Sequence, residues 1–229
     1  MADIRTIGKE LAGTLKRYNA DHIEVRLEET HTTRIAYRGK ELESVDRAHA
    51  CGGNVRALVR GGWGFVSFNS FDDLPSRIER AVQQARFVGR EESKLAEVEP
   101  AVDTVLISDS ANPMAVPLAE KKQLLDEYND IIWRTPNLQT SFINYGDSHK
   151  KTVFLNSAGS HTEQERADIT LRLTAVAAKD GQVQQAGLSL GSRGDFNQIK
   201  GLHRSAAEIA KRAVELLSAP QVKGGEYTV

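Results

Sequence analysis

The spacing of hydrophobic residues switches between two periods along this chain. Where apolar residues recur every three or four positions, the pattern predicts amphipathic helices. These helices begin near Ile4, Leu74, Pro117 and Leu202. Where apolar and polar residues alternate, the pattern predicts half-buried strands. The strands cover residues 22–28 with an extension to 37, 41–45, 55–59, 63–68, 138–145, 151–155, 163–178 and 182–190.

The most distinctive stretch is the glycine-rich segment Cys51–Phe68. Its first half alternates apolar and polar residues, and Gly61-Gly62 is a two-residue connection that permits positive φ in a tight hairpin. An aromatic strand then follows. Two interpretations remain open: a hairpin of the sheet core, or a hairpin that lines a cleft. The residues expected to line that cleft are Gly62, Trp63, Gly64 and Phe65.

The order of elements repeats, since each half runs helix, several strands, helix. The closing helices resemble one another at Ile78–Val82 and Ala210–Val214, as in an internal duplication. Strands in consecutive runs favour the α+β class with mainly antiparallel sheets. We therefore predict two helix–antiparallel-strands–helix units. The predicted parts are an N-terminal α+β domain (1–89), a charged linker (90–116), a second, central α+β domain (117–220) and the start of a further domain (221–229).

Composition narrows the class of protein. Of 229 residues, 30 are Lys or Arg and 31 are Asp or Glu, so the net charge of −1 does not favour nucleic acid or an anionic membrane as a partner. No apolar run is long enough to cross a bilayer, and the first residues lack the apolar region of a signal peptide. The single cysteine, Cys51, excludes an intrachain disulfide framework. We expect a cytoplasmic globular protein.

Candidate chemistry is sparse. The glycines at 187, 191 and 194 lack the spacing of a phosphate-binding loop. The closest pair of the six histidines is nine residues apart, so no helical zinc site with two nearby histidines is predicted. His22 and Glu24 share one face of a strand, which is typical of a solvated surface. His161-Thr162-Glu163 matches a fragment of the zinc deaminase signature, but that chemistry needs a later pair of cysteines.

Two further groups carry reactive or charged side chains. Cys51 would act as a nucleophile only beside a histidine. His49 lies two positions before it, and along a strand that separation is too long for a hydrogen bond. A small, partly buried thiol is the favoured interpretation. Glu163, Glu165 and Asp168 form an acidic group that is typical of exposed charges before a strand. The residues alone predict no complete active site.

Several segments in order resemble the N-terminal part of the TldD/PmbA family of metallopeptidases. They are Ile23–Glu29, Tyr37–Val45, Gly61–Phe65 and Leu155–Ser160. The Gly-Trp-Gly-Phe run is more similar to the TldD branch than to the PmbA branch. Ala50–Asn54 departs from the usual approach to that hairpin, which leaves the branch open.

The resemblance implies a zinc-dependent peptidase that acts on peptides as a homodimer or as a heterodimer of the two branches. The family's zinc motif, His-Glu-x-x-x-His with a later Cys, begins after the segment that matches Gly224–Val229. No catalytic, cofactor-binding or metal-binding residue can therefore be assigned to this chain, and zinc is expected in full-length relatives.

The leading hypothesis is the N-terminal, non-catalytic region of a TldD-like peptidase that processes or degrades peptides and contributes to the substrate cleft and the dimer. The alternative is a standalone peptide-binding or assembly module without peptidase activity, with an exposed strand edge as the binding surface. A third hypothesis, with Cys51 as a nucleophile, is less favoured. The coding sequence after Val229 would separate the first two.

Overall fold

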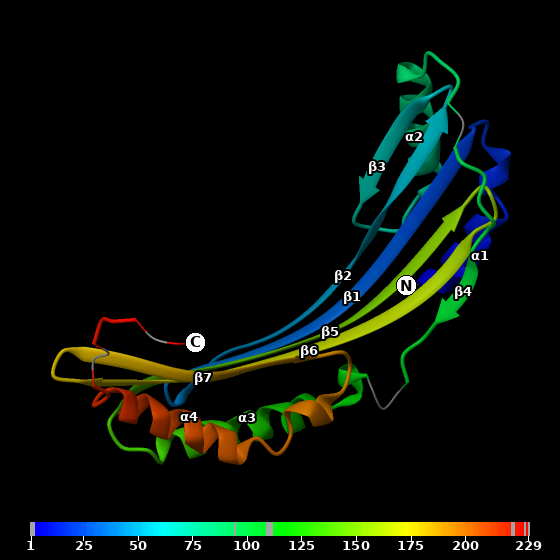
Figure 1. Ribbon diagram of the computed structural model, residues 1–229. Coiled ribbons are helices and arrows are strands. Elements are labelled where there is room, and N and C mark those ends of the chain that lie inside the picture. The colour runs from blue at the N-terminus through cyan, green and yellow to red at the C-terminus, as the bar shows by residue number, and fades with distance from the viewer. Residues whose placement is uncertain (1–2, 94, 109–111, 221–222, 227, 229) are drawn as a thin grey trace. The chain divides into compact units, whose positions relative to one another are not determined.

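The computed structural model describes residues 3–93, 95–108, 112–220, 223–226 and 228. Its α-helices are α1 (Ile4–Ala12), α2 (Leu74–Val88), α3 (Leu118–Trp133) and α4 (His203–Leu216) (Figure 1). Its strands are β1 (His22–Arg38), β2 (Glu41–Val59), β3 (Gly62–Phe68), β4 (Val102–Val105), β5 (Leu138–Asn156), β6 (His161–Lys179) and β7 (Gln182–Ser192). The predicted α+β class is confirmed. Of the predicted final segment, 221–229, residues 221–222, 227 and 229 lie outside the described residues.

The strands form one sheet of order β3-β2-β1-β5-β6-β4, and β7 pairs with β6 outside this path. The β2–β3 and β6–β7 pairs are antiparallel, as predicted. The β4–β6 pair is parallel, with Val102 opposite His161, because β4 arrives through a long connection and not through a hairpin.

Two strands are longer than the sequence predicts. β2 is one strand from Glu41 to Val59, and β5 is one strand from Leu138 to Asn156. The glycines inside β2 do not interrupt the strand. At Gly53, an added Cβ would lie 2.0 Å from the carbonyl oxygen of Arg26, so a larger residue would not fit there. Glycine at this position therefore allows β1 and β2 to approach closely.

The hairpin turn after β2 lies one residue earlier than predicted. Arg60 and Gly61 have φ of 48° and 76°, and Gly62 already pairs with Val59. Two central residues with positive φ match the right-handed twist of the flanking strands. The two turn residues are thus Arg60 and Gly61 and not Gly61 and Gly62. Gly62 belongs to β3 and packs closely against α2, where an added Cβ would lie 2.4 Å from the Ala85 oxygen.

The chain divides into two compact units. Unit 1 comprises residues 1–32, 48–112 and 148–167, and unit 2 comprises residues 33–47, 113–147 and 168–229. Each unit draws on three stretches of chain because β1, β2, β5 and β6 contribute residues to both. The segment expected to be a linker, 90–116, contains β4.

Each unit has its own hydrophobic core. In unit 1, Ile4 and Leu11 of α1 and Ile78 and Val82 of α2 pack with alternate residues of the strands. In unit 2, α3 and α4 lie side by side, and their apolar faces pack with alternate residues of β1, β5 and β6 (Figure 1). The alternate apolar residues that predicted the strands are therefore the residues that the strands contribute to both cores.

A buried ion pair sits within the core of unit 2. Lys121 Nζ lies 2.6 Å from Asp147 Oδ2, and the two side chains are 2% and 0% exposed. The hydroxyl of Tyr145 donates to the same carboxylate oxygen. Lys121 lies on the buried face of α3, one turn before Leu125, and the helical spacing of the sequence does not identify its partner on β5. In the part of the chain that the structure describes, no helix is long and apolar enough to cross a membrane.

Candidate functional site

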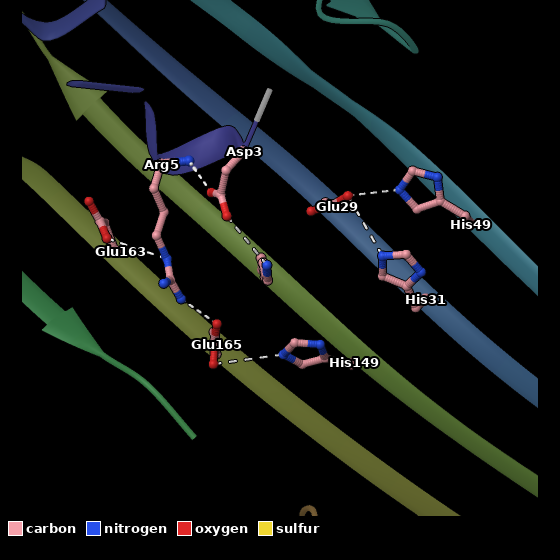
Figure 2. Close-up of polar contacts among 9 residues, drawn as sticks. Asp3, Arg5, Glu29, His31, His49, His149, Glu163 and Glu165 are labelled. Carbon is pink, nitrogen blue, oxygen red and sulfur yellow. Dashed lines mark hydrogen bonds and ion pairs between the residues drawn. The ribbon is translucent and has the colours of Figure 1, made fainter. Parts of the chain in front are cut away.

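The candidate site in unit 1 is a group of polar side chains that continues the core-facing side of the sheet. In β1, the buried residues Ile23, Val25 and Leu27 are followed at the same spacing by Glu29 and His31. Because side chains alternate along a strand, these two residues lie on the face that carries the core. His49 of β2, His149 of β5 and Glu165 of β6 occupy equivalent alternate positions (Figure 2).

Arg5 of α1 joins two carboxylates of β6. Its guanidinium hydrogen-bonds to Glu165, and its Nε lies 3.5 Å from Glu163 Oε2 (Figure 2). The backbone N–H of Arg5 donates to Asp3 Oδ1, so Asp3 caps α1 as predicted, and this bond is the main cause that lowers the pKa of Asp3. The capped helix thus fixes Arg5 over the two acidic residues of the sheet.

Two histidines lie against these carboxylates. His149 Nε2 is 3.8 Å from Glu165 Oε2, and His161 Nε2 is 3.4 Å from Glu163 Oε1. Neither Nε2 atom has a hydrogen-bond partner, although both atoms are buried. Burial lowers the pKa of His149, and this effect outweighs the nearby Glu165 carboxylate. His149 is therefore a neutral imidazole near neutral pH.

A second cluster lies on β1 and β2. His49 Nε2 is 2.9 Å from Glu29 Oε1, and His31 Nε2 is 3.6 Å from the same oxygen (Figure 2). The two imidazole rings stack, with centroids 4.3 Å apart and an interplanar angle of 17°. The three ligand atoms lie within 4.8 Å of one another, which is a spacing that could hold a metal ion.

The residues predicted to line a cleft divide by strand face. Gly62 and Gly64 face α2, where an added Cβ would lie 2.4 Å from the Ala85 oxygen and 1.9 Å from the Ala81 oxygen. Trp63 and Phe65 point the other way and are 40% and 56% exposed. The glycines therefore let α2 pack closely, while the two aromatic side chains face solvent.

A cavity of about 870 Å³ lies near Trp63 in unit 1. His22, Glu24 and Leu58 of the sheet line one side, and residues 92–93 and 95–98 line the other. Trp63 pairs with Leu58 across the hairpin and makes an edge-to-face contact with His22 at 6.5 Å. It is thus next to residues that line the cavity.

An arginine links Trp63 to the cavity wall. The Arg56 guanidinium lies 4.5 Å from the centre of the Trp63 ring, and its Nη1 is 2.9 Å from Glu24 Oε1. A cation held over an aromatic face restrains both side chains. The His22–Glu24 pair, expected to be a solvated strand face, is partly buried beside this cavity.

The other candidates from the sequence have structural partners. Cys51 is partly buried, and its thiol makes a weak contact of 3.7 Å with the Asn69 oxygen. His49 binds Glu29. Glu163 and Glu165, expected to be exposed, are instead largely buried and paired with Arg5, because the amphipathic helix α1 also carries a cation toward the sheet.

Sequence reasoning missed the cluster of Glu29, His31 and His49. Glu29 and His31 precede the Gly39 turn by ten and eight residues, and His49 follows it by ten. Both strands leave the same turn, so residues at similar distances from it lie near one another, but the pairing that brings His49 beside Glu29 and His31 is fixed by the sheet and not by this count. The predicted break of β2 after residue 45 hid this relation.

Two family models match the chain. The model described as PmbA/TldA metallopeptidase domain 1 matches residues 23–88, and the model described as the PmbA/TldA metallopeptidase central domain matches residues 111–217. They follow one another in the order that the segments of the sequence suggested.

Curated relatives match nearly the whole chain. Metalloprotease slr0863 of Synechocystis is 35% identical over 99% of this chain and 50% of its own length. A metalloprotease of Methanothermobacter thermautotrophicus is 27% identical over 91% of this chain and 46% of its own length. The chain spans about half the length of the curated relatives that it matches.

Solved structures share the fold. A Thermotoga maritima protein proposed to modulate a DNA gyrase aligns over 97% of this chain and 50% of its own, with a TM-score of 0.75 and 14% identity. TldE of Thermococcus kodakarensis aligns over 90% of this chain and 46% of its own, with a TM-score of 0.68 and 15% identity.

Proposed function

This chain belongs to the PmbA/TldD metallopeptidase family, and we propose that it is the N-terminal, non-catalytic region of a zinc-dependent, TldD-like peptidase. In this role it binds part of an extended peptide substrate and contributes to the dimer. The observation that carries the proposal is the ordered match to the first and central domains of the family, over a chain half as long as its relatives.

The residues of this chain do not fit the family's zinc motif. None of its six histidines is followed directly by glutamate, as His-Glu-x-x-x-His requires. Zinc in such a motif polarises a carbonyl and activates water. Peptide hydrolysis by this chain alone is therefore not expected.

The cavity beside Trp63 supports a role in holding peptide. Leu58, Leu95 and Val98 give it apolar surface, while Glu24 and Arg60 give it charge of both signs. A site with apolar walls and a few polar groups suits a peptide with mixed side chains. Trp63, held by Arg56, offers a flat aromatic surface next to it.

The first experiment measures hydrolysis. The purified chain is incubated with zinc and an unstructured peptide, and the products are followed with and without EDTA. We expect no EDTA-sensitive cleavage. Cleavage that EDTA abolishes, at a rate proportional to the concentration of this chain, would overturn the non-catalytic role.

The second experiment measures peptide binding to the same chain. Replacing Trp63 with Ala should weaken binding of an unstructured peptide by about tenfold, the scale of losing one aromatic contact. Trp133 of unit 2 provides the matched control, since Trp133→Phe removes an indole outside the cavity. Equal affinities for the Trp63→Ala variant and the wild type, with folding intact, would count against the cleft.

The oligomeric state of the chain and the coding sequence after Val229 test the proposal against a standalone module. We propose a cytoplasmic dimer, formed with a second copy or with a partner of the other branch. Light scattering of the purified chain tests self-association. A reading frame that continues past Val229 into His-Glu-x-x-x-His favours the peptidase region, whereas a stop codon there favours the standalone peptide-binding module.

A further inference from the structure

We propose that Glu29, His31 and His49 bind one divalent transition-metal ion, with zinc as the favoured occupant. None of the three residues belongs to a His-Glu-x-x-x-His run, and metal binding by them requires no peptidase activity. Its three ligands come from neighbouring strands of unit 1, joined by the turn at Gly39.

The distances suit a metal. Zinc bonds of 2.0–2.2 Å place tetrahedral ligand atoms roughly 3.3–3.6 Å apart. His49 Nε2 and His31 Nε2 lie 2.9 Å and 3.6 Å from Glu29 Oε1, and all three ligand atoms fall within 4.8 Å of one another. Small side-chain rotations on a fixed backbone therefore suffice to form the site.

The donor set selects the class of metal. Two imidazoles and one carboxylate are the ligands of many zinc sites, and imidazole favours zinc or copper over magnesium or calcium. Three protein ligands leave a coordination position open to water. The side chains of His31 and His49 are 43% and 39% exposed, so a hydrated ion can reach them.

The framework is rigid enough to hold the ligands in place. Glu29 and His31 lie two residues apart on β1, so both project from one face of the strand. β1 is an inner strand of the sheet, paired with β2 on one side and β5 on the other.

Binding would open the 17° angle between the stacked rings, because two nearly parallel imidazoles do not direct their lone pairs at one point.

The test titrates the tag-free, EDTA-treated chain with Zn²⁺ in a calorimeter, and with Co²⁺ to record its visible absorption. We expect one equivalent to bind and the melting temperature to rise. Glu29→Gln, His31→Gln and His49→Gln should each weaken binding at least about 100-fold, since loss of an outer-shell partner alone costs 10–100-fold.

The control is His203→Gln. His203 of α4 forms a similar pair with Glu127 at 3.0 Å, but this pair is not part of the three-ligand cluster. The His203→Gln variant should bind zinc like the wild type. No binding by the folded wild type, or binding that survives all three ligand substitutions, would overturn the site. Peptide hydrolysis is a separate readout, so this test and that of the peptidase role can fail independently.

Discussion

His149 carries a cost of burial that depends on pH. Its side chain is 9% exposed and faces Glu165 of β6, while Lys151 of its own strand and His31 of β1 also act on its charge. Burial is the largest cause of its lowered pKa, and Lys151 and His31 lower that pKa further. The folded chain therefore holds this imidazole neutral at a pH where the unfolded chain begins to protonate it.

We predict that this histidine makes the fold less stable in mild acid. Because the folded pKa lies below the ordinary value of 6.5, its contribution is complete above about pH 6.5 and falls as the pH drops toward the folded pKa. The loss is at most about 1.4 kcal/mol per pH unit. Urea unfolding from pH 7.5 to 5.5 should show a smaller loss for His149→Gln than for the wild type.

The control for that measurement is a histidine on the surface. His203→Gln changes an exposed imidazole in unit 2 and should keep the pH dependence of the wild type. Indistinguishable slopes for His149→Gln and the wild type would show that His149 gains its proton in the folded state as readily as in the unfolded chain.

At the scale of elements, the packing of α2 on β3 depends on glycine. A Cβ at Gly64 would lie 1.9 Å from the carbonyl oxygen of Ala81 and 2.8 Å from the nitrogen of Ala85. These are backbone atoms of a helix, so they cannot move aside without moving α2 itself. The alternation of buried glycine and exposed aromatic residues along β3 is therefore a consequence of helix packing.

We predict that Gly64→Ala destabilises the chain by about 3 kcal/mol, the upper end for overpacking. The matched control is Gly13→Ala at the end of α1, where φ is −71° and the nearest atom to a new Cβ is 3.9 Å away. That change should be neutral or slightly stabilising. Denaturant midpoints measure both, and equal midpoints would contradict the packing argument.

Local chemistry made much of this architecture predictable. Asp180-Gly181 was expected to turn a hairpin, and both residues have positive φ between β6 and β7. Asp3 was expected to cap α1 and does so. Each of these features depends on a few adjacent residues, which is why a single sequence reveals them.

Features that depend on register were not predictable in the same way. The length of β2 depends on how closely β1 approaches Gly53, and the cluster at His49 depends on which residues of β1 lie opposite. Arg5 meets Glu163 and Glu165 only because α1 packs on distant strands. Pairing over such separations is fixed by the whole sheet, so no window of the sequence contains it.

At the scale of the whole molecule, the two units share backbone. β1, β2, β5 and β6 each contribute residues to both units without a break in the strand. Each core therefore packs on strands that continue, without a break, into residues of the other unit. Loss of one core should remove pairing partners that the other core needs.

We predict that both units unfold in one transition. The chain has two tryptophans, Trp63 in unit 1 and Trp133 in unit 2, so Trp133→Phe and Trp63→Phe variants report on each unit separately by fluorescence. Their denaturant midpoints should agree within the error of the measurement, apart from the cost of each substitution.

The sharper form of this prediction adds a change in one unit and observes the other. Gly64→Ala, placed in the Trp63→Phe background, should lower the midpoint reported by Trp133 although residue 64 belongs to unit 1. Conversely, Lys121→Met leaves Asp147 as an unpaired buried charge in unit 2, which costs about 3–5 kcal/mol. It should lower the midpoint reported by Trp63. If each substitution shifted only the signal of its own unit, the shared strands would not couple the two cores.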